Sequence, residues 1–563
     1  MEQKKIIYQV FPRLFGNVEE NPVFNGSKQR NGVGKFADFT PKALEEIKCL
    51  GTTHVWYTGV IAHATKTDYT AFNIPKDHDA IVKGNAGSAY AIKDYYDVDP
   101  DLAENVNLRM EEFKDLVQRT HDAGLKVIID FVPNHVARSY SSQANGLIFE
   151  SLGAGDDNTK AFLPSNNFYY LPGQPLSLHF GAMQEDFEYS EFPAKATGNN
   201  RFDAYPSETD WYETVKLNYG VDYMNGGSCH FDPIPNTWHK MLAVLLFWTE
   251  KGVDGFRCDM AEMVPVEFWK WAIAQVKAKT SQPVLFIAEV YNPQLYRSYI
   301  FDGGFDYLYD KVGLYDTLRA VMCDQTFASE ITKAWQAVEG IQPYMLNFLE
   351  NHDEQRIASD FFAGDAQMGI PAMTVAALMN TNPVMLYSGQ EFGESGMDKE
   401  GFSGCDGRTS IFDYWSVASV RNWVNNRAFD GEKLSEEQRS LREMYAKLLN
   451  DVCHEPVVSL GAFYDLMYAN ADNNDFSMRY QYAFLRKYAN EVLLVVANFD
   501  RMEQNVRLKI PAEVFQALGF KDNEAAEVKD FFTGEEYIST LTTACPYALT
   551  IPACSVKVLK FKY

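Results

Sequence analysis

Four stretches of the sequence determine the expected fold: DFVPNH (residues 130–135), GFRCDMAE (255–262), FIAEVY (286–291) and FLENHD (348–353). Each contains an apolar run that ends in charged or polar residues. This pattern is typical of a buried parallel strand whose C-terminal end opens into an active site. Asp259, Glu289 and Asp353 each stand just past such a run. We therefore expect three carboxylates from three separate strands to converge on one pocket.

Runs of strand length that are apolar, β-branched or aromatic occur eight times, at residues 6–10, 53–61, 126–132, 253–256, 284–288, 305–309, 345–349 and 383–387. Amphipathic segments separate them. In LRMEEFKDLVQRTHDAG, for example, Leu108, Phe113, Leu116 and Val117 fall on one helical face, and Gly124 can end the helix. Eight strands that alternate with helices predict an α/β fold, the (β/α)8 TIM barrel.

The step from the third run to the fourth is too long for one strand–helix–strand unit. About 120 residues separate the two runs, where roughly 30 would suffice, so an inserted subdomain B is expected at residues 136–228. Loops after barrel strands stand over the active-site face, and this segment is expected to wall the cleft. Short runs separated by turn residues predict a C-terminal all-β sandwich domain at 437–563. Residues 1–135 and 229–436 are then left for the catalytic barrel.

The charge and hydropathy of the chain argue against several classes of protein. The formal net charge of -25 would repel phosphate backbones and anionic lipid headgroups, so no nucleic-acid or membrane-surface partner is expected. No apolar run reaches the roughly 18 residues of a membrane span. The N-terminal MEQKKIIYQVFPRLF is interrupted by polar residues and is interpreted as a first strand rather than a leader. Nothing in the composition indicates an oligomeric state.

The eight cysteines are scattered along the chain without a CxxC pair. This spacing argues against a zinc site and a disulfide framework, and it favours free thiols in a reducing compartment. We therefore expect a cytoplasmic protein. The alternative is an exported protein whose leader is absent from this sequence.

A cluster of carboxylates is what the cleavage of a sugar bond needs, and the neighbours of the three carboxylates suggest how they would divide that chemistry. Two carboxyl groups lie about 5 to 5.5 Å apart in retaining glycosidases and farther apart in inverting ones, and adjacent strand ends permit either. Arg257 precedes Asp259 by two residues and points to the same face of an extended strand, where it would keep Asp259 ionised, as a nucleophile requires. Glu289 follows an apolar run, which favours the protonated form that a general acid needs. His352 and Asp353 are placed to bind sugar hydroxyls.

The chain resembles the α-amylase superfamily of glycoside hydrolases over nearly its whole length. The four stretches quoted above look like the signature regions of that family. IIYQVFPRLF is similar to its first strand, SAYAIKDYYDVDP to its loop before the third helix, PVMLYSGQEFG to its eighth strand, and YAFLRKYANEVLLVVANF to its C-terminal sandwich.

The resemblance implies a role for each matching residue. Asp259 would be the nucleophile, Glu289 the acid/base, and Asp353 the carboxylate that fixes the distorted sugar. Substrate binding and the architecture of its site would fall to Tyr90, Asp94, His135, Arg257 and His352. Among these, Tyr90 would be the aromatic platform under the sugar ring. Asn134 matches a frequent calcium ligand.

The sequence departs from the family pattern in two places. Many members continue with AAKH after the nucleophile, whereas Met260, Ala261, Glu262 and Met263 follow here, so the preference between α-1,4 and α-1,6 bonds, and between endo and exo action, stays open. The loop NGSKQRNGVG lacks the acidic residues of the family's other metal loop, and Asn134 alone cannot hold Ca²⁺, which takes six to eight oxygen ligands. The chemistry requires no cofactor; a structural calcium ion is the one group that the resemblance suggests.

Three functions remain in view. The leading expectation is retaining hydrolysis of α-glucosidic bonds, above all α-1,4 bonds, in starch, glycogen or maltodextrin oligosaccharides. A transglycosylase, a sucrose phosphorylase or a trehalose-forming isomerase would use the same covalent intermediate. A non-catalytic glucan-binding protein is disfavoured because the chain keeps all three carboxylates.

Overall fold

Eight parallel strands form the centre of the molecule in the computed structural model, which describes residues 4–142, 150–178 and 189–563. The strands are β1 Ile6–Val10, β2 His54–Tyr57, β5 Lys126–Phe131, β12 Gly255–Cys258, β13 Leu285–Ala288, β14 Tyr307–Tyr309, β15 Met345–Leu346 and β16 Val384–Tyr387. They pair in chain order from β1 to β15, and β16 returns to pair with β1. A parallel bridge between Asn347 and Val384 closes the circle. The predicted (β/α)8 barrel is confirmed.

The second predicted strand, at residues 53–61, is two strands in the structure. Its first part is β2, which stays in the barrel, whereas β3 (Ile61–His63) leaves it and pairs with β4 (Ile92–Val98). Gly59 turns the chain between them with φ +75. A Cβ at this position would lie 2.4 Å from the ring of Phe11, so only glycine fits.

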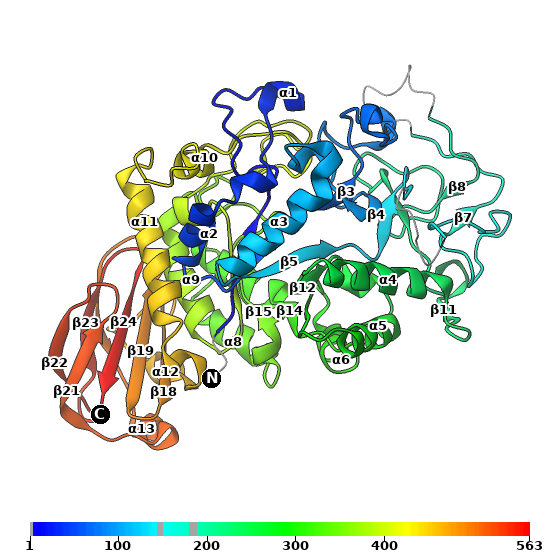
Figure 1. Cartoon of the computed structure of the whole chain (residues 1–563). Helices are drawn as coiled ribbons and strands as arrows, with labels where there is room; N and C mark the ends of the chain where they lie inside the picture. The colour runs from blue at the N-terminus through cyan, green and yellow to red at the C-terminus, as the bar shows by residue number, and fades with distance from the viewer. Residues whose placement is uncertain (1–3, 143–149, 179–188) are drawn as a thin grey trace.

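Helices cover the outside of the barrel (Figure 1). They are α2 Pro41–Lys48, α3 Arg109–Asp122, α4 Asn236–Glu250, α5 Val266–Lys279, α6 Tyr296–Phe301, α7 Asp316–Met322, α8 Glu330–Ala337, α9 Gly369–Leu378 and α10 Ala418–Val424. Helix α3 buries Phe113, Leu116 and Val117 as predicted, but Leu108 precedes the helix and is 50% exposed. Within the described ranges, no helix combines the length and the apolar character that crossing a membrane requires.

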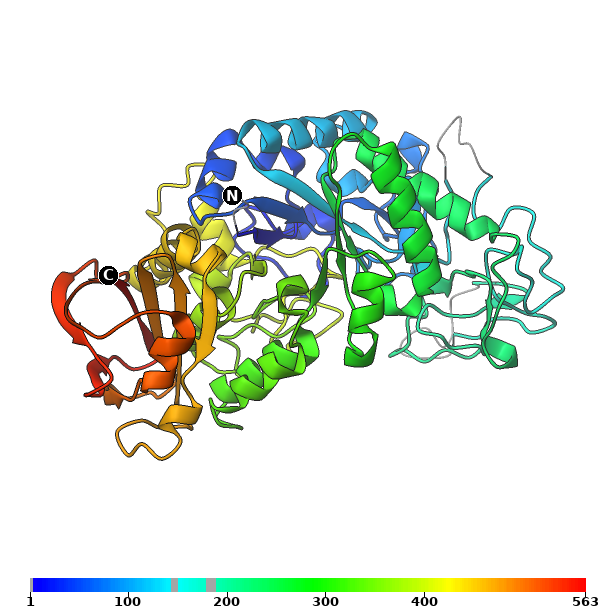
Figure 2. The same ribbon diagram turned by 90° about the horizontal axis from the view of Figure 1, so that it is seen from below.

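The segment inserted after β5 and the C-terminal domain lie at opposite ends of the molecule (Figures 1 and 2). The described part of the insertion contains three short antiparallel pairs: β6 His135–Ala137 with β9 Thr214–Lys216, β7 Tyr170–Leu171 with β8 Ala194–Lys195, and β10 Val221–Asp222 with β11 Ser228–Cys229. Residues 143–149 and 179–188 of the predicted subdomain lie outside the described residues. The pairing of β6 with β9 holds the insertion against the C-terminal end of β5.

The C-terminal part of the chain is an antiparallel sheet domain. Its strands are β17 Ala462–Asp465, β18 Gln481–Tyr488, β19 Glu491–Asn498, β20 Gln504–Leu508, β21 Asn523–Asp530, β22 Glu536–Leu541, β23 Tyr547–Ile551 and β24 Ser555–Lys562. Six of them form one sheet in the order β17-β18-β19-β24-β21-β22, and β20 pairs with β23. The boundary predicted at residue 437 falls inside helix α11 (Glu436–Ala446), and the sheet begins only at Ala462.

One helix and one arginine join the barrel to this sheet domain. All ten residues of α9 are buried, as expected of a helix that is apolar on every side, and α9 contacts both β19 and β24. Arg486 of β18 donates to the carbonyl oxygen of Leu378 at 2.8 Å, and to those of Val458 and Gly461 at 2.7 and 2.6 Å. The junction is therefore largely apolar, and Arg486 places a buried cation in it.

Candidate active site

The three predicted carboxylates line one pocket at the C-terminal ends of the barrel strands. β12 and β13 pair with Cys258 opposite Ala288, so the next residues, Asp259 and Glu289, leave the sheet at the same level. Asp259 and Glu289 are buried, whereas the side chain of Asp353 is 41% exposed. The pocket encloses about 750 Å³, part of which is open to solvent. The structure thus brings together the groups that the sequence placed on three separate strands.

A single buried arginine contacts two of these carboxylates. Nη1 of Arg257 lies 2.9 Å from Oδ1 of Asp259, and Nη2 lies 2.7 Å from Oε2 of Glu289. Nη1 also lies 3.3 Å from Oδ1 of Asp130, and Nε donates to the hydroxyl of Tyr309 at 3.2 Å. Because Arg257 is fully buried, these contacts are little screened by water. The guanidinium therefore fixes the positions of both carboxylates relative to one another.

The electrostatics of the cluster differ from the expectation in one respect. Burial raises the pKa of Asp259 well above its usual range and the carboxylates of Glu289 and Asp353 add to the rise, although Arg257 opposes it. Arg257 thus favours the ionised form that a nucleophile requires, as expected, while burial and the neighbouring acids act against it. Burial also raises the pKa of Asp130 to about 6. Acids that lie this close together oppose one another's ionisation, so the cluster as a whole holds a proton more firmly than separate acids would.

Tyr90 and His352 form a stacked pair beside the carboxylates. Their ring centroids are 5.1 Å apart, and the hydroxyl of Tyr90 lies 2.5 Å from Nε2 of His352. Nδ1 of His352 lies 2.8 Å from Nε2 of Gln9, and Nε2 lies 3.1 Å from Oδ2 of Asp353. Burial, together with the charge of Arg257, lowers the pKa of His352 well below its usual value. His352 is therefore a neutral group with polar partners on both ring nitrogens.

Of two further residues predicted to bind substrate, His135 lines the pocket and Asp94 does not. His135 lines the pocket and its ring lies 5.1 Å from that of Trp211. Burial lowers the pKa of His135 to about 3, so this imidazole is also neutral. Asp94 does not line the pocket: it lies on β4, accepts a hydrogen bond from the main chain of Tyr96, and borders a separate cavity. Its placement gives no support to direct contact with substrate.

The surroundings of Asn134 do not fit the suggested calcium ion. Its Nδ2 donates to the carbonyl oxygen of Gly198 at 2.8 Å, and its Oδ1 accepts a hydrogen bond from the ammonium group of buried Lys216. A cation of the protein thus already binds the oxygen that calcium would need. Nowhere in residues 4–142, 150–178 and 189–563 do three or more His, Cys, Asp or Glu side chains gather in a way that could hold a metal. The metal-ligand role expected for Asn134 is not supported.

Sequence reasoning missed part of the pocket wall, which includes Lys83, Ser88, Trp211, Glu213, Tyr291 and Phe412. Most of these lie in loops, where no periodicity marks them. Two residues near the pocket could have been found from their positions in the sequence. Tyr291 follows Glu289 by two residues in FIAEVY, and Asp130, which lies beneath the pocket, pairs with Arg257 in the register of β5 and β12.

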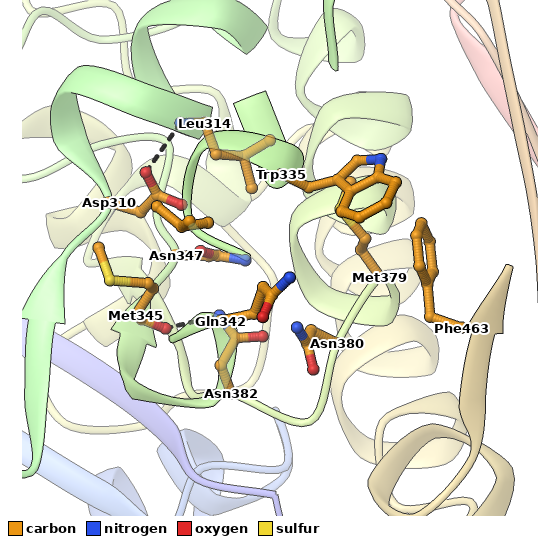
Figure 3. A pocket seen from close by; sticks show the side chains of 11 residues that line it. Asp310, Leu314, Trp335, Gln342, Met345, Asn347, Met379, Asn380, Asn382 and Phe463 are labelled. Carbon is orange, nitrogen blue, oxygen red and sulfur yellow. Dashed lines mark hydrogen bonds between the residues drawn. The ribbon is translucent and has the colours of Figure 1, made fainter. Parts of the chain in front are cut away.

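A second cavity lies between the barrel wall, α8 and β17 (Figure 3). It spans about 380 Å³, part of it open to solvent, and its lining includes Trp335, Phe463, Asn347, Asn380 and Asn382. Its acidic side chain is Asp310, whose Oδ1 accepts a hydrogen bond from the main chain of Leu314 at 2.9 Å. Among the residues described as lining this cavity, Asp310 has neither a second carboxyl group nor an arginine beside it. The pair of carboxyls that bond cleavage needs is found in the first pocket.

A (β/α)8 barrel whose neighbouring strand ends present two carboxylates on one arginine has the site of a glycoside hydrolase. The family model of the α-amylase catalytic domain matches residues 9–457. The chain therefore belongs to the α-amylase family of glycoside hydrolases, which are enzymes of carbohydrate metabolism.

Individual relatives are distant. Alpha-amylase 3 of Dictyoglomus thermophilum is 23% identical over 440 residues, which is 74% of each chain. The maltogenic α-amylase AmyB of Thermotoga neapolitana aligns over 99% of both chains with a TM-score of 0.63 and 20% identity. The α-amylase GTA of Geobacillus thermoleovorans, solved in complex with acarbose, aligns over 99% of this chain and 98% of its own with a TM-score of 0.63 and 18% identity. At such identities the structural likeness shows the fold.

Proposed function

We propose that the protein hydrolyses α-1,4-glucosidic bonds of maltodextrin oligosaccharides with retention of the anomeric configuration. The observation that carries the proposal is the contact of Arg257 with both Asp259 and Glu289. One guanidinium that holds both carboxylates in a single pocket provides the paired groups that glycoside cleavage requires.

The proposed reaction has two steps. Glu289 gives its proton to the departing glycosidic oxygen while Asp259 attacks the anomeric carbon and forms a covalent glycosyl–enzyme intermediate. Glu289 then takes a proton from water, and the resulting hydroxide displaces Asp259. Asp353 binds hydroxyls of the distorted sugar and Tyr90 lies under its ring, while the buried His352 contacts and positions both of them.

Family membership supports the substrate class. The catalytic-domain model spans most of the chain, and related proteins are named as α-amylases, one of them maltogenic and another solved with acarbose. The pocket around the carboxylates is partly open to solvent, so a chain of sugar rings can extend out of it, in line with an oligosaccharide substrate.

Product analysis tests this proposal. The purified protein is incubated with maltoheptaose, cyclodextrin, pullulan, panose and sucrose, and the products are separated by size while NMR follows the first anomer formed. We expect shorter malto-oligosaccharides in the α configuration, and Asp259→Asn should lower turnover by about 10³-fold or more without unfolding the protein. Retained activity in Asp259→Asn, or β-anomeric products, would overturn the proposal. If longer or rearranged sugars form instead, the enzyme transfers the glucosyl unit to a sugar acceptor rather than to water.

We also propose a reducing, cytoplasmic location. All eight cysteines are unpaired thiols in the structure, and Cys258, Cys453 and Cys554 are buried, which supports a compartment where disulfides do not form. Fractionation of the native cells tests this, and recovery of the activity outside the cell would contradict it.

A further inference from the structure

The two oxygens of the Glu289 carboxyl group have different partners. Oε2 accepts a hydrogen bond from the main-chain N–H of Met260 at 2.7 Å and forms the ion pair with Arg257 at 2.7 Å. Oε1 lies 2.5 Å from the hydroxyl of Tyr291. The partners of Oε2 are an N–H donor and a cation, so this oxygen must remain an acceptor. A hydroxyl can donate or accept, so only Oε1 can carry a proton without losing its partner.

The tyrosine that binds Oε1 stays protonated across the working pH range. Burial raises the pKa of Tyr291 well above its usual value, and the nearby carboxylates of Glu289 and Asp353 raise it further. Tyr291 follows Glu289 by two residues, in the segment directly after the end of β13, and its hydroxyl reaches the carboxyl group of Glu289. Both line the pocket. Tyr291 therefore lies beside the acid in the wall of the same pocket.

A second glutamate holds this tyrosine in place. Oε2 of Glu262 accepts hydrogen bonds from the main-chain N–H groups of Tyr291 at 3.1 Å and of Asn292 at 2.9 Å. Glu262 lies in the turn after the nucleophile strand, where Met260 has the left-handed φ of 43 and directs its N–H at Glu289. The turn after β12 thus binds the acid directly through Met260 and indirectly through Glu262 and Tyr291.

We propose that Tyr291, held by Glu262, is a positioning residue that makes Oε1 of Glu289 the oxygen that delivers and recovers the catalytic proton. This inference rests on the proposed function. In the first step the proton on Oε1 moves to the glycosidic oxygen, which keeps the electron pair of the broken bond, while an oxygen of Asp259 bonds to the anomeric carbon. The Tyr291 hydroxyl then donates to the ionised Oε1. In the second step water gives its proton to Oε1 as its oxygen bonds to the anomeric carbon and the bond to Asp259 breaks.

The substitution Tyr291→Phe tests the proposal because it removes only the hydroxyl. We expect kcat/KM on maltotriose to fall about 10- to 100-fold, since a hydrogen bond to a charged group is lost. The alkaline limb of the kcat/KM profile should move to higher pH, because the ionised carboxylate loses a donor. On α-maltosyl fluoride, whose leaving group needs no proton, kcat/KM should stay within about threefold of the wild type. Tyr296→Phe is the matched control, because the Tyr296 hydroxyl has no hydrogen-bond partner among the described residues.

A second variant, Glu262→Leu, removes the support of Tyr291 without touching Glu289. It should show the same selective loss on maltotriose, with circular dichroism confirming the fold. An unchanged pH profile in Tyr291→Phe, or an equal loss on both substrates, would overturn the positioning role. If Asp259→Asn is inactive in the same assays, such a result rejects Tyr291 alone; an active Asp259→Asn would instead reject the proposed function.

Discussion

Arg257 and Arg486 are both fully buried, but the groups around them differ. Arg257, at the strand ends, faces Asp259, Glu289 and Asp130. Burial acts to lower its pKa, but the charges around it, that of Glu289 above all, raise the pKa well above the usual value. Arg486, at the junction with the C-terminal sheet, donates to three main-chain carbonyl groups, and burial lowers its pKa to about 10. Both side chains are almost inaccessible to solvent.

The difference shows that a buried charge does not by itself mark a site. At Arg486 the charge satisfies carbonyl oxygens and joins two parts of the fold. At Arg257 it holds acids that reach a pocket, where their protonation can change during a reaction. The same substitution at both positions should therefore affect different properties.

Arg257→Lys should have the largest effect. An ammonium group lacks the planar fork that reaches Asp259 and Glu289 together, so kcat/KM on maltotriose should fall by about 10³-fold. Steady-state kinetics measures the loss, and circular dichroism shows that the variant is folded. Activity within tenfold of the wild type would show that the shared guanidinium is not what organises the site.

Arg486→Lys should leave the chemistry intact and weaken the fold. A lysine at this position keeps about one of the three charge-assisted hydrogen bonds, so the free energy of unfolding should fall by about 4 kcal/mol. Urea unfolding measures this change, while kcat/KM on maltotriose should stay at the wild-type level at low temperature. A selective loss of activity in the folded variant would contradict the contrast between the two arginines.

The contrast extends to buried acids without an arginine partner. Burial raises the pKa of Asp310, in the second cavity, to about 6. The folded state then binds a proton more tightly than the unfolded state, so this group contributes stability below about pH 4 that is lost as pH rises through 6. Asp310→Asn should remove the loss, and between pH 4 and 7 the stability of the variant should rise relative to the wild type by about 3 kcal/mol. Parallel pH dependences for the two proteins would show that Asp310 does not titrate in this way.

The smallest effect should come from metal removal. Because Lys216 already binds Oδ1 of Asn134, EDTA should change neither the thermal midpoint nor the activity. A fall in the midpoint that added calcium reverses would show that a metal does stabilise the fold. Lys216→Ala, in which Oδ1 of Asn134 is released, is the comparison that would reveal a latent cation site.

Much of the barrel could be predicted from the sequence because buried parallel strands are continuous apolar runs between helices of period 3.6. The prediction of a single strand at 53–61 was wrong because both halves of the run are apolar. Only the turn at Gly59 separates the barrel strand from the strand that leaves the barrel. The prediction that Leu108 lies on the buried face of a helix was wrong because the helical spacing of apolar residues continues past the true start of α3. The boundary at 437 missed the helices that precede the sheet.

The site residues at the ends of strands could be predicted from the sequence, whereas those in loops could not. Arg257 lies in β12 and Asp259 follows the last residue of that strand, so they are two residues apart and their side chains reach the same side. Trp211 and Phe412 reach the pocket from segments without periodicity, and the partner of Asn134 lies on another strand. The raised pKa of Asp259 depends on burial among several acids, which spacing along the chain does not reveal.

The central claim is that Asp259 forms a covalent bond to the sugar while Glu289 moves the proton. Glu289→Gln incubated with α-maltosyl fluoride tests it most directly, because fluoride leaves without a proton and the missing base slows hydrolysis of the intermediate. Proteolysis and mass spectrometry of the quenched protein should find a maltosyl group on the peptide that contains Asp259. A maltosyl group on another residue, or consumption of the fluoride without any adduct, would contradict the account.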